Sequence, residues 1–197
     1  MSLKSYLNET LVECGVDEAG RGSLAGPVFA AAVILPKDFK SENIKDSKKL
    51  TEKGRLRALK EIEENAIAWS VEMSRPEVID EYNIQNATFG AMNKAITNLS
   101  VKPEHILVDG NVFDSFDEIP YTCIIKGDNE YLSIAAASIV AKVYRDEYMK
   151  NIHHQFPVYD WDKNKGYGSK KHIDVIKEEG ITYHHRKTFL KNIFVNA

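Results

Sequence analysis

The feature that most constrains this chain is a pair of acids, Asp17 and Glu18, placed between two apolar segments. Residues 11–17 (LVECGVD) and 27–36 (PVFAAAVILP) each have the composition of a strand, and a glycine-rich turn joins them. A charged pair is costly to bury at such a position unless a partner compensates it. We therefore expect these acids to belong to a functional site.

The rest of the sequence predicts an α/β fold with a mixed sheet flanked by helices. Further strands are expected at 66–73, 105–110 and 121–125, with the first three strands of the chain antiparallel. We expect Asn83 to interrupt the second helix and Gly180 to cap the last one. The helical patterns cover residues 47–66, 75–100, 129–156 and 170–180.

The length of 197 residues is typical of one domain with a full core, and no linker divides the chain. We expect residues 12–150 to form the core of this single domain, residues 1–197. Residues 151–197 are expected to form a short C-terminal helical region that contributes to substrate binding. Nothing in the sequence demands more than a monomer.

Hydropathy and cysteine content also indicate the cellular compartment of the protein. No apolar run approaches the length of a membrane span, and the N-terminus lacks the apolar region of a secretory signal. The two cysteines, Cys14 and Cys123, lie far apart and outside any C-x-x-C pair, so we expect buried free thiols and no disulfide or zinc site. A cytoplasmic protein without membrane contact is expected.

The charges are unevenly distributed, although the formal net charge is only -3. Residues 61–90 hold seven acids and one base, whereas residues 163–191 hold eight bases and three acids. Such asymmetry favours one face for a polyanion, while an ordinary solvated helix rich in lysine explains the charge equally well.

Four acids interrupt or follow apolar segments, namely Asp17, Glu18, Asp109 and Asp128. Each acid alone could be a turn or capping residue, but active sites of α/β sheets collect beyond strand ends. Oxygen ligands without a histidine or cysteine cluster favour Mg²⁺ or Mn²⁺, and two such ions can hydrolyse a phosphodiester.

Strand geometry limits how the first two acids act, because neighbouring side chains point to opposite faces. Either the strand twists away at Glu18, or one of the pair contributes its backbone carbonyl. We expect Asp17 and Asp128 to be the closest metal ligands. Glu18 and Asp109 would then complete or orient the second ion.

Five motifs appear in a characteristic order, and together they resemble the bacterial ribonuclease HII family, the type 2 ribonucleases H. They are GVDEAGRGSLAGPVFAAAVIL, DSKKL, ILVDGN, KGDNEYLSIAAASIVAKVYRD and NKGYGSKKH, and the resemblance covers about residues 12 to 190. It implies an RNase H-like fold and a catalytic role for all four acids with Mg²⁺ or Mn²⁺.

The resemblance also implies the substrate: RNA in RNA–DNA hybrids, and single ribonucleotides embedded in duplex DNA. Cleavage on the 5′ side of the ribonucleotide would leave 3′-hydroxyl and 5′-phosphate ends. The implied biological roles are ribonucleotide excision repair and removal of RNA primers.

Several residues are expected to contact that substrate. Glycines let the backbone approach a ribose 2′-hydroxyl, which distinguishes RNA from DNA. The resemblance places the Gly-Arg-Gly motif on Gly20, Arg21 and Gly22 and a substrate-sensing tyrosine on Tyr167. Ser169 stands where the family often has threonine, which preserves the hydroxyl. Basic residues expected at phosphates or nearby are Lys48, Lys49, Lys126 and Lys165.

Other polar residues are given structural roles. Asp146 is expected to pair with Arg145 or a neighbouring helix residue, with metal contact as the lesser alternative. Ser133 and Ser138 are interpreted as packing residues. We expect His172 and Arg186 to line the basic face. The adjacent histidine pairs, interpreted as surface or packing residues, are His153 with His154 and His184 with His185.

Three alternatives remain open at this point. A type 3 ribonuclease H is the nearest, although that group normally carries an extra N-terminal domain and only about a dozen residues precede the first strand here. A hybrid-binding module with a structural ion would lack catalysis. A junction resolvase with carboxylates at strand ends is the most distant.

Overall fold

The computed structural model describes residues 3–194 and contains a five-stranded mixed sheet in the order β3-β2-β1-β4-β5. The pairs β1–β2 and β2–β3 are antiparallel, whereas β1–β4 and β4–β5 are parallel. The predicted antiparallel arrangement of the first three strands is confirmed. The strands are β1 (Glu13–Ala19), β2 (Val28–Ile34), β3 (Ala68–Ser74), β4 (His105–Asp109) and β5 (Tyr121–Ile124).

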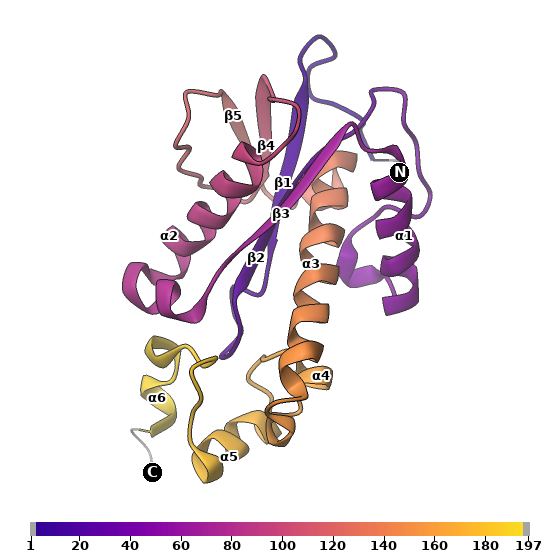
Figure 1. The fold of residues 1–197 in the computed structure, drawn as a ribbon. Helices are drawn as coiled ribbons and strands as arrows, with labels where there is room; N and C mark the ends of the chain where they lie inside the picture. The colour runs from indigo at the N-terminus through magenta and orange to yellow at the C-terminus, as the bar shows by residue number, and fades with distance from the viewer. Residues whose placement is uncertain (1–2, 195–197) are drawn as a thin grey trace.

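Helices cover both faces of this sheet. Helix α2 lies on one face, α1 and α3 lie on the other, and α4, α5 and α6 gather beyond one end of the sheet (Figure 1). In the described part of the chain, no helix has the length and apolar character needed to cross a membrane. The helices are α1 (Glu52–Asn65), α2 (Pro76–Thr97), α3 (Leu132–His153), α4 (Trp161–Asn164), α5 (Lys170–Glu179) and α6 (Lys191–Phe194).

Two local expectations about the helices are confirmed. Helix α2 is interrupted at Asn83, where φ is +67° and the side-chain oxygen accepts the N–H groups of Gln85 and Asn86. Helix α5 ends at Gly180, which has φ +83° and donates its N–H to the carbonyl of Ile176. A left-handed residue at each point lets the chain change direction.

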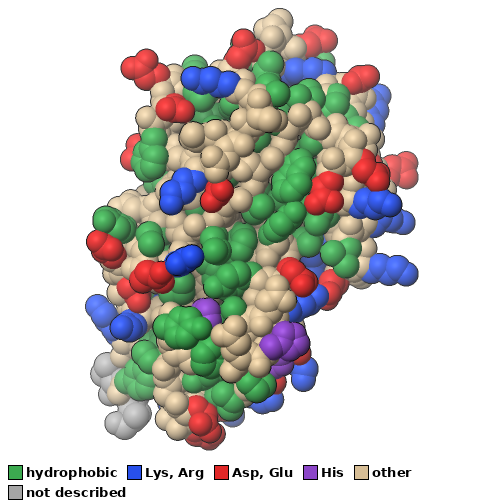
Figure 2. All heavy atoms as spheres, viewed as in Figure 1, with side chains coloured by type: hydrophobic (Ala, Val, Ile, Leu, Met, Phe, Trp, Pro, Cys, Tyr) green, Lys and Arg blue, Asp and Glu red, His purple; other side chains and the backbone are tan. Residues whose placement is uncertain are grey.

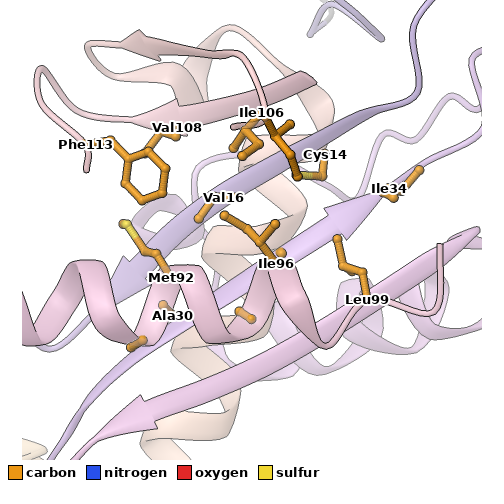
Figure 3. Close-up of a cluster of buried hydrophobic side chains, with 14 of the residues drawn as sticks. Cys14, Val16, Ala30, Ile34, Met92, Ile96, Leu99, Ile106, Val108 and Phe113 are labelled. Carbon is orange, nitrogen blue, oxygen red and sulfur yellow. The ribbon is translucent and has the colours of Figure 1, made fainter. Parts of the chain in front are cut away.

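Strand β2 is apolar throughout because both of its faces are covered. Successive side chains of a strand point to opposite faces, so Ala30, Ala32 and Ile34 pack with α2 on one side. Their neighbours Phe29, Ala31 and Val33 pack with α1 and α3 on the other. Figure 3 shows the α2 side of this core, with side chains of the helix turned toward those of β1 and β4.

Helix α3 lies unusually close to β1, because small residues line the contact. A β-carbon on Gly15 would lie 2.2 Å from the carbonyl carbon of Ser133, so only glycine fits there. The alanine-rich middle of α3 is completely buried against the same face. This contact fixes the height of β1, and of the acids that follow Gly15, relative to α3.

The start and end of β1 differ from the predicted range. The strand was expected over residues 11–17, but it is paired to Ala19, with Asp17 opposite Ala31 and Glu18 opposite Ala30. Asp17 and Glu18 were expected to end this strand but lie within it, and the option that the strand twists away at Glu18 is wrong. Antiparallel pairing with the apolar β2 continues past both acids.

The C-terminal region attaches to the glycine-rich segment that links β1 and β2. The N–H of Gly26 donates to the carbonyl of His184 at 2.8 Å, and the N–H of Arg186 donates to the carbonyl of Leu24 at 2.9 Å. Behind these bonds lies a cluster around Trp161, which is fully buried and stacked on Tyr159 at 5.0 Å. The C-terminal region thus packs around an aromatic cluster that also includes Ala25 and Met149.

Candidate active site

The strand topology brings three of the four predicted acids to one edge of the sheet. Strands β1, β4 and β5 are parallel, so their C-terminal ends coincide. The last registered pair between β1 and β4 joins Val16 to Val108, which places Asp17 beside Asp109. Asp128 lies in a short 3-10 turn (Gly127–Asn129) that follows β5 at this edge.

Glu18 approaches the same edge from the other face. In β1, Val16 packs with α2 and Ala19 packs with α3, so alternation places Asp17 on the α3 face and Glu18 on the α2 face. The Glu18 carboxylate lies 3.6 Å from the guanidinium of Arg21. The first two acids therefore flank the strand rather than share one side of it.

Neighbouring N–H groups orient the aspartates. The N–H of Gly127 donates to Oδ1 of Asp109 at 2.7 Å, and the N–H of Glu18 donates to Oδ1 of Asp17 at 2.7 Å. The side-chain amide of Asn129 donates to Oδ1 of Asp128 at 2.8 Å. Each bond holds one carboxylate oxygen in place, which preorganises the site.

The acids of this edge oppose one another's ionisation. Burial, followed by the charges of Glu18 and Asp109, raises the pKa of Asp17 well above its usual value. Burial also raises the pKa of Glu18 and of Asp109, and the neighbouring acids Asp109 and Asp128, respectively, add to this. A bound divalent cation would relieve this repulsion, because it stabilises the anionic forms.

The donor set fits a hard cation. All four candidate ligands are carboxylates, and oxygen-only sites without a soft ligand are typical of Mg²⁺ and Mn²⁺. Across residues 3–194, no three acidic, histidine or cysteine side chains are already arranged as a complete ligand set. The case that these four carboxylates bind a divalent cation therefore rests on their donor chemistry and on their mutual repulsion.

The segment with the two predicted phosphate-binding lysines lies against the acids. Burial alone would lower the pKa of Lys48, but the charges of Asp128 and Asp17 are among those that raise it. The ammonium of Lys49 donates to Oδ1 of Asn129 at 2.6 Å, beside Asp128. Both lysines are therefore placed where a phosphate near the acids could be bound.

Two buried serines join this lysine segment to α3. The hydroxyls of Ser47 and Ser138 are 3.0 Å apart. Ser138 was interpreted as a packing residue only. Its hydroxyl also opposes the rise that burial causes in the pKa of Asp17.

The glycine-rich turn lies directly after these acids and depends on a buried arginine. Gly20 has φ +94°, and a β-carbon on it would lie 1.9 Å from Nε of Arg145. Arg145 donates to the carbonyls of Pro27 and Ala25 and to the hydroxyl of Ser23. The turn therefore needs glycine at position 20 because an arginine side chain fills its inner side.

Tyr167 lies beside this turn, although almost 150 positions separate them in the sequence. The carbonyl of Gly166 accepts the N–H groups of Leu24 and Ala25 at 2.8 and 3.2 Å. The ring of Tyr167 is 5.4 Å from the guanidinium carbon of Arg145, and the side chain is 40% exposed. The predicted sugar-sensing turn and the predicted sensing tyrosine are thus brought together.

Three other residues predicted to contact the substrate lie in turns or at a helix start. Lys126 is exposed and adopts φ +59° in the turn that leads to Asp128. The ammonium of Lys165 donates to the carbonyl of Asp162. Ser169 caps α5 by accepting the N–H of His172 at 3.2 Å. Substrate contact by these residues stays a prediction.

Two predictions about the basic face are wrong. His172 and Arg186 were expected to line it, but both side chains are completely buried. Nε2 of His172 accepts the indole N–H of Trp161 at 3.1 Å, and Arg186 binds backbone carbonyls of the glycine-rich segment. On the face shown in Figure 2, basic and acidic side chains are interspersed with apolar ones.

Other structural roles are confirmed or refined. Asp146 pairs with Lys142 at 2.7 Å, a neighbouring helix residue, and with Arg55 at 3.7 Å. His184 and His185 are buried packing residues, as interpreted. Both cysteines are free; Cys14 is buried, but Cys123 is only partly buried, contrary to expectation.

The arginines that shape the site are the main residues that the sequence reasoning missed. Arg145 does carry a signal in its helical spacing, because it lies between Ala141 and Met149, four residues away on each side, and both are fully buried. A charged residue on such a buried face indicates a specific polar partner. Arg186 has no comparable signal, because it looks like one more base in a basic segment.

Known proteins resemble this chain along most of its length. A family model described as ribonuclease HII matches residues 14–197. A ribonuclease HII from Bacteroides thetaiotaomicron is 58% identical over 187 residues, which are 95% of this chain and 94% of that protein. The chain belongs to the ribonuclease HII family. A family member from Porphyromonas gingivalis is 51% identical over 189 residues, 96% of this chain and 94% of that protein.

Solved structures share the fold. The ribonuclease H2 of Pyrococcus horikoshii matches 93% of this chain and 97% of its own, with a TM-score of 0.78 and 24% identity. The ribonuclease HII of Archaeoglobus fulgidus, solved in a complex with PCNA, matches 92% of this chain and 96% of its own, with a TM-score of 0.74 and 26% identity. The expected RNase H-like architecture is confirmed.

Proposed function

We propose that this ribonuclease HII family member hydrolyses the phosphodiester on the 5′ side of a ribonucleotide, leaving 3′-hydroxyl and 5′-phosphate ends. Family membership makes it a metal-dependent endoribonuclease that cleaves the RNA strand of RNA–DNA hybrids. We extend the substrate to single ribonucleotides within duplex DNA. The observation that carries this proposal is the meeting of three parallel strand ends, with their acids, beside the glycine-rich turn.

The four acids would hold the ions, with Asp17 and Asp128 as the closest ligands and Glu18 and Asp109 completing or orienting the second ion. When bound, two Mg²⁺ or Mn²⁺ ions activate a water molecule and stabilise the departing 3′-oxygen. Support comes from the raised pKa values of Asp17, Glu18 and Asp109, which favour a cation. A ribonuclease HIII of the same fold has been solved with Mn²⁺.

The remaining residues would position the nucleic acid. Lys48 and Lys49, next to Asp128, would bind phosphates through charge-assisted hydrogen bonds. The turn around Gly22 would lie against the sugar, and the exposed ring of Tyr167 would stack on the sugar or base. Arg21 would engage a neighbouring phosphate.

A digestion assay tests the proposal. Duplex DNA with one ribonucleotide is incubated with the protein in Mg²⁺, Mn²⁺ or EDTA, and the ends of the products are mapped. We expect one cut on the 5′ side of the ribonucleotide with either ion and none in EDTA. The Asp128→Asn variant should lose activity by orders of magnitude and keep its fold. Cleavage in EDTA, or a fully active variant, would show that the site is wrongly assigned.

The nearest alternative is less well supported. The type 3 ribonuclease H of Bst matches 91% of this chain but only 64% of its own length, at 20% identity. Relatives of type 2 match along almost their whole length. We also propose that the protein acts in ribonucleotide excision repair and in removal of RNA primers, because its substrates arise on DNA. We further propose that it is a cytoplasmic monomer.

A further inference from the structure

The guanidinium of Arg186 holds three backbone carbonyls of the glycine-rich segment. Its Nη2 donates to the carbonyl of Gly20 at 2.8 Å, its Nη1 to that of Arg21 at 2.8 Å, and its Nε to that of Gly26 at 2.9 Å. Within residues 3–194 no acid lies within ion-pair distance of Arg186. A fully buried cation is therefore compensated by peptide dipoles of one short loop.

This contact determines where the next N–H groups point. In a trans peptide the C=O and the following N–H point in opposite directions, and the chain has no cis peptide in its described part. When the carbonyls of Gly20 and Arg21 point inward to Arg186, the N–H groups of Arg21 and Gly22 must point outward. Both residues are exposed, and a β-carbon on Gly22 would meet no atom within 4 Å.

These two N–H groups are available for a ligand. Among the described residues, neither N–H donates a hydrogen bond to the protein. They are adjacent donors on an open surface, directly after the acids of β1. The buried positive charge of Arg186 polarises the same two peptides, which strengthens their N–H groups as donors toward an oxygen.

We propose that Arg186 is a positioning residue for ribose recognition, which holds the turn so that the N–H groups of Arg21 and Gly22 donate to oxygens of the ribonucleotide at the cleavage site. The inference rests on the proposed function. It assigns a role in selectivity to a side chain that is buried and touches no substrate. Arg145 supports the other side of the turn by filling the space next to Gly20.

The first test measures selectivity in Asp128→Asn protein, in which binding can be followed without cleavage. The selectivity ratio is the Kd for an all-DNA duplex divided by the Kd for the same duplex with one ribonucleotide, both in Mg²⁺. Arg186→Lys keeps the charge but lacks the planar guanidinium whose three nitrogens reach the three carbonyls. Arg186→Met removes the charge. We expect both to lower the ratio at least about fivefold, mainly by weaker binding of the ribonucleotide duplex.

Arg57→Met serves as the matched control, because Arg57 is an exposed arginine of α1 whose guanidinium bonds the side chain of Asn43. It should leave the ratio unchanged. Melting temperatures identify variants that fold. A folded Arg186 variant with the ratio of the parent would overturn the inference. If the parent itself prefers neither duplex, the proposed function fails and the inference fails with it.

A second measurement covers the case in which both Arg186 variants unfold. In Asp128→Asn protein with Arg186 intact, the backbone amide resonances of Arg21 and Gly22 are followed by NMR during titration. The duplex with one ribonucleotide should shift both downfield and slow their exchange, and the all-DNA duplex should not. Identical responses to the two duplexes would overturn the inference without any Arg186 variant.

Discussion

Gly20 and Arg145 occupy one space: a β-carbon on the glycine would lie 1.9 Å from Nε of the arginine. The φ of +94° at Gly20 adds a second obstacle to any other residue. Gly20→Ala should therefore destabilise the protein by about 3 kcal/mol, from backbone strain and overpacking together. Thermal unfolding should show a decrease in Tm of about 8 °C.

Gly22→Ala provides the contrast, because the added methyl group would meet no protein atom within 4 Å. We expect a Tm within about 2 °C of the wild type. Cleavage of a single-ribonucleotide duplex should nevertheless decrease about 10²-fold, since the methyl group displaces the sugar from the turn. A destabilised Gly22→Ala protein, or one with full activity, would contradict this assignment.

Asp17 should limit stability in the absence of divalent ions. Its pKa is raised first by burial and then by the charges of Glu18 and Asp109, so at neutral pH its ionised form costs folding free energy. Asp17→Asn removes the charge and keeps an oxygen for the N–H of Glu18. In EDTA the variant should melt a few degrees higher than the wild type, while its activity in Mg²⁺ falls by orders of magnitude.

Divalent ions should reverse that order of stability. An ion that binds only the folded state stabilises it by RT ln(1 + [L]/Kd). Titration with Mn²⁺ or Mg²⁺ should therefore raise the Tm of the wild type more than that of Asp17→Asn. Equal shifts in the two proteins would indicate that Asp17 does not contribute to ion binding. Lys60→Met serves as the control, because Lys60 is exposed on α1 and pairs with Glu64.

The free energy of unfolding should also decrease in mild acid, because His185 is buried within the C-terminal region. Burial, with a further contribution from His172, lowers the pKa of His185 to about 4. An unfolded histidine titrates near 6.5, so between these values the unfolded chain binds a proton that the folded chain excludes. Stability from this group is complete above about pH 7 and is lost as the pH falls toward 4.

His185→Asn tests this, because an amide does not titrate and its oxygen can accept the N–H of Thr182 that Nδ1 accepts now. Between pH 7 and 5, the unfolding free energy of the wild type should fall by about 2 kcal/mol more than that of the variant, measured by urea unfolding. The exposed His154→Asn should follow the wild type. Parallel curves for His185→Asn and wild type would contradict the prediction.

Local patterns predicted most of the fold. The apolar run of β2 indicated a strand covered on both faces, Asn83 marked the break of α2, and Gly180 marked the end of α5. The parallel pairing of β1 with β4 and of β4 with β5 was not predicted, since periodicity does not give strand order. Four acids after or within apolar segments were nonetheless enough to predict their meeting at one edge.

Contacts between distant segments could not be predicted in the same way. The side chain of Arg186 and the carbonyl of Gly20 are 166 positions apart, and nothing in the composition around Arg186 distinguishes it from the neighbouring Lys187. The extension of β1 from Asp17 to Ala19 had a similar cause. Asp17 and Glu18 are poor strand residues, but pairing with β2 outweighs that local preference.

The distance in sequence between Arg186 and the turn at Gly20 also bears on the order of folding. A contact that closes so long a stretch of chain forms slowly, because the entropy lost on closure precedes the gain from the bond. The sheet edge with its acids, covered by α3, can assemble from residues 13–153 before the last helices dock. A chain at that stage would have its catalytic acids in place but not the glycine-rich turn that Arg186 holds. During folding, the capacity to hydrolyse a phosphodiester would therefore arise before selectivity for ribonucleotides.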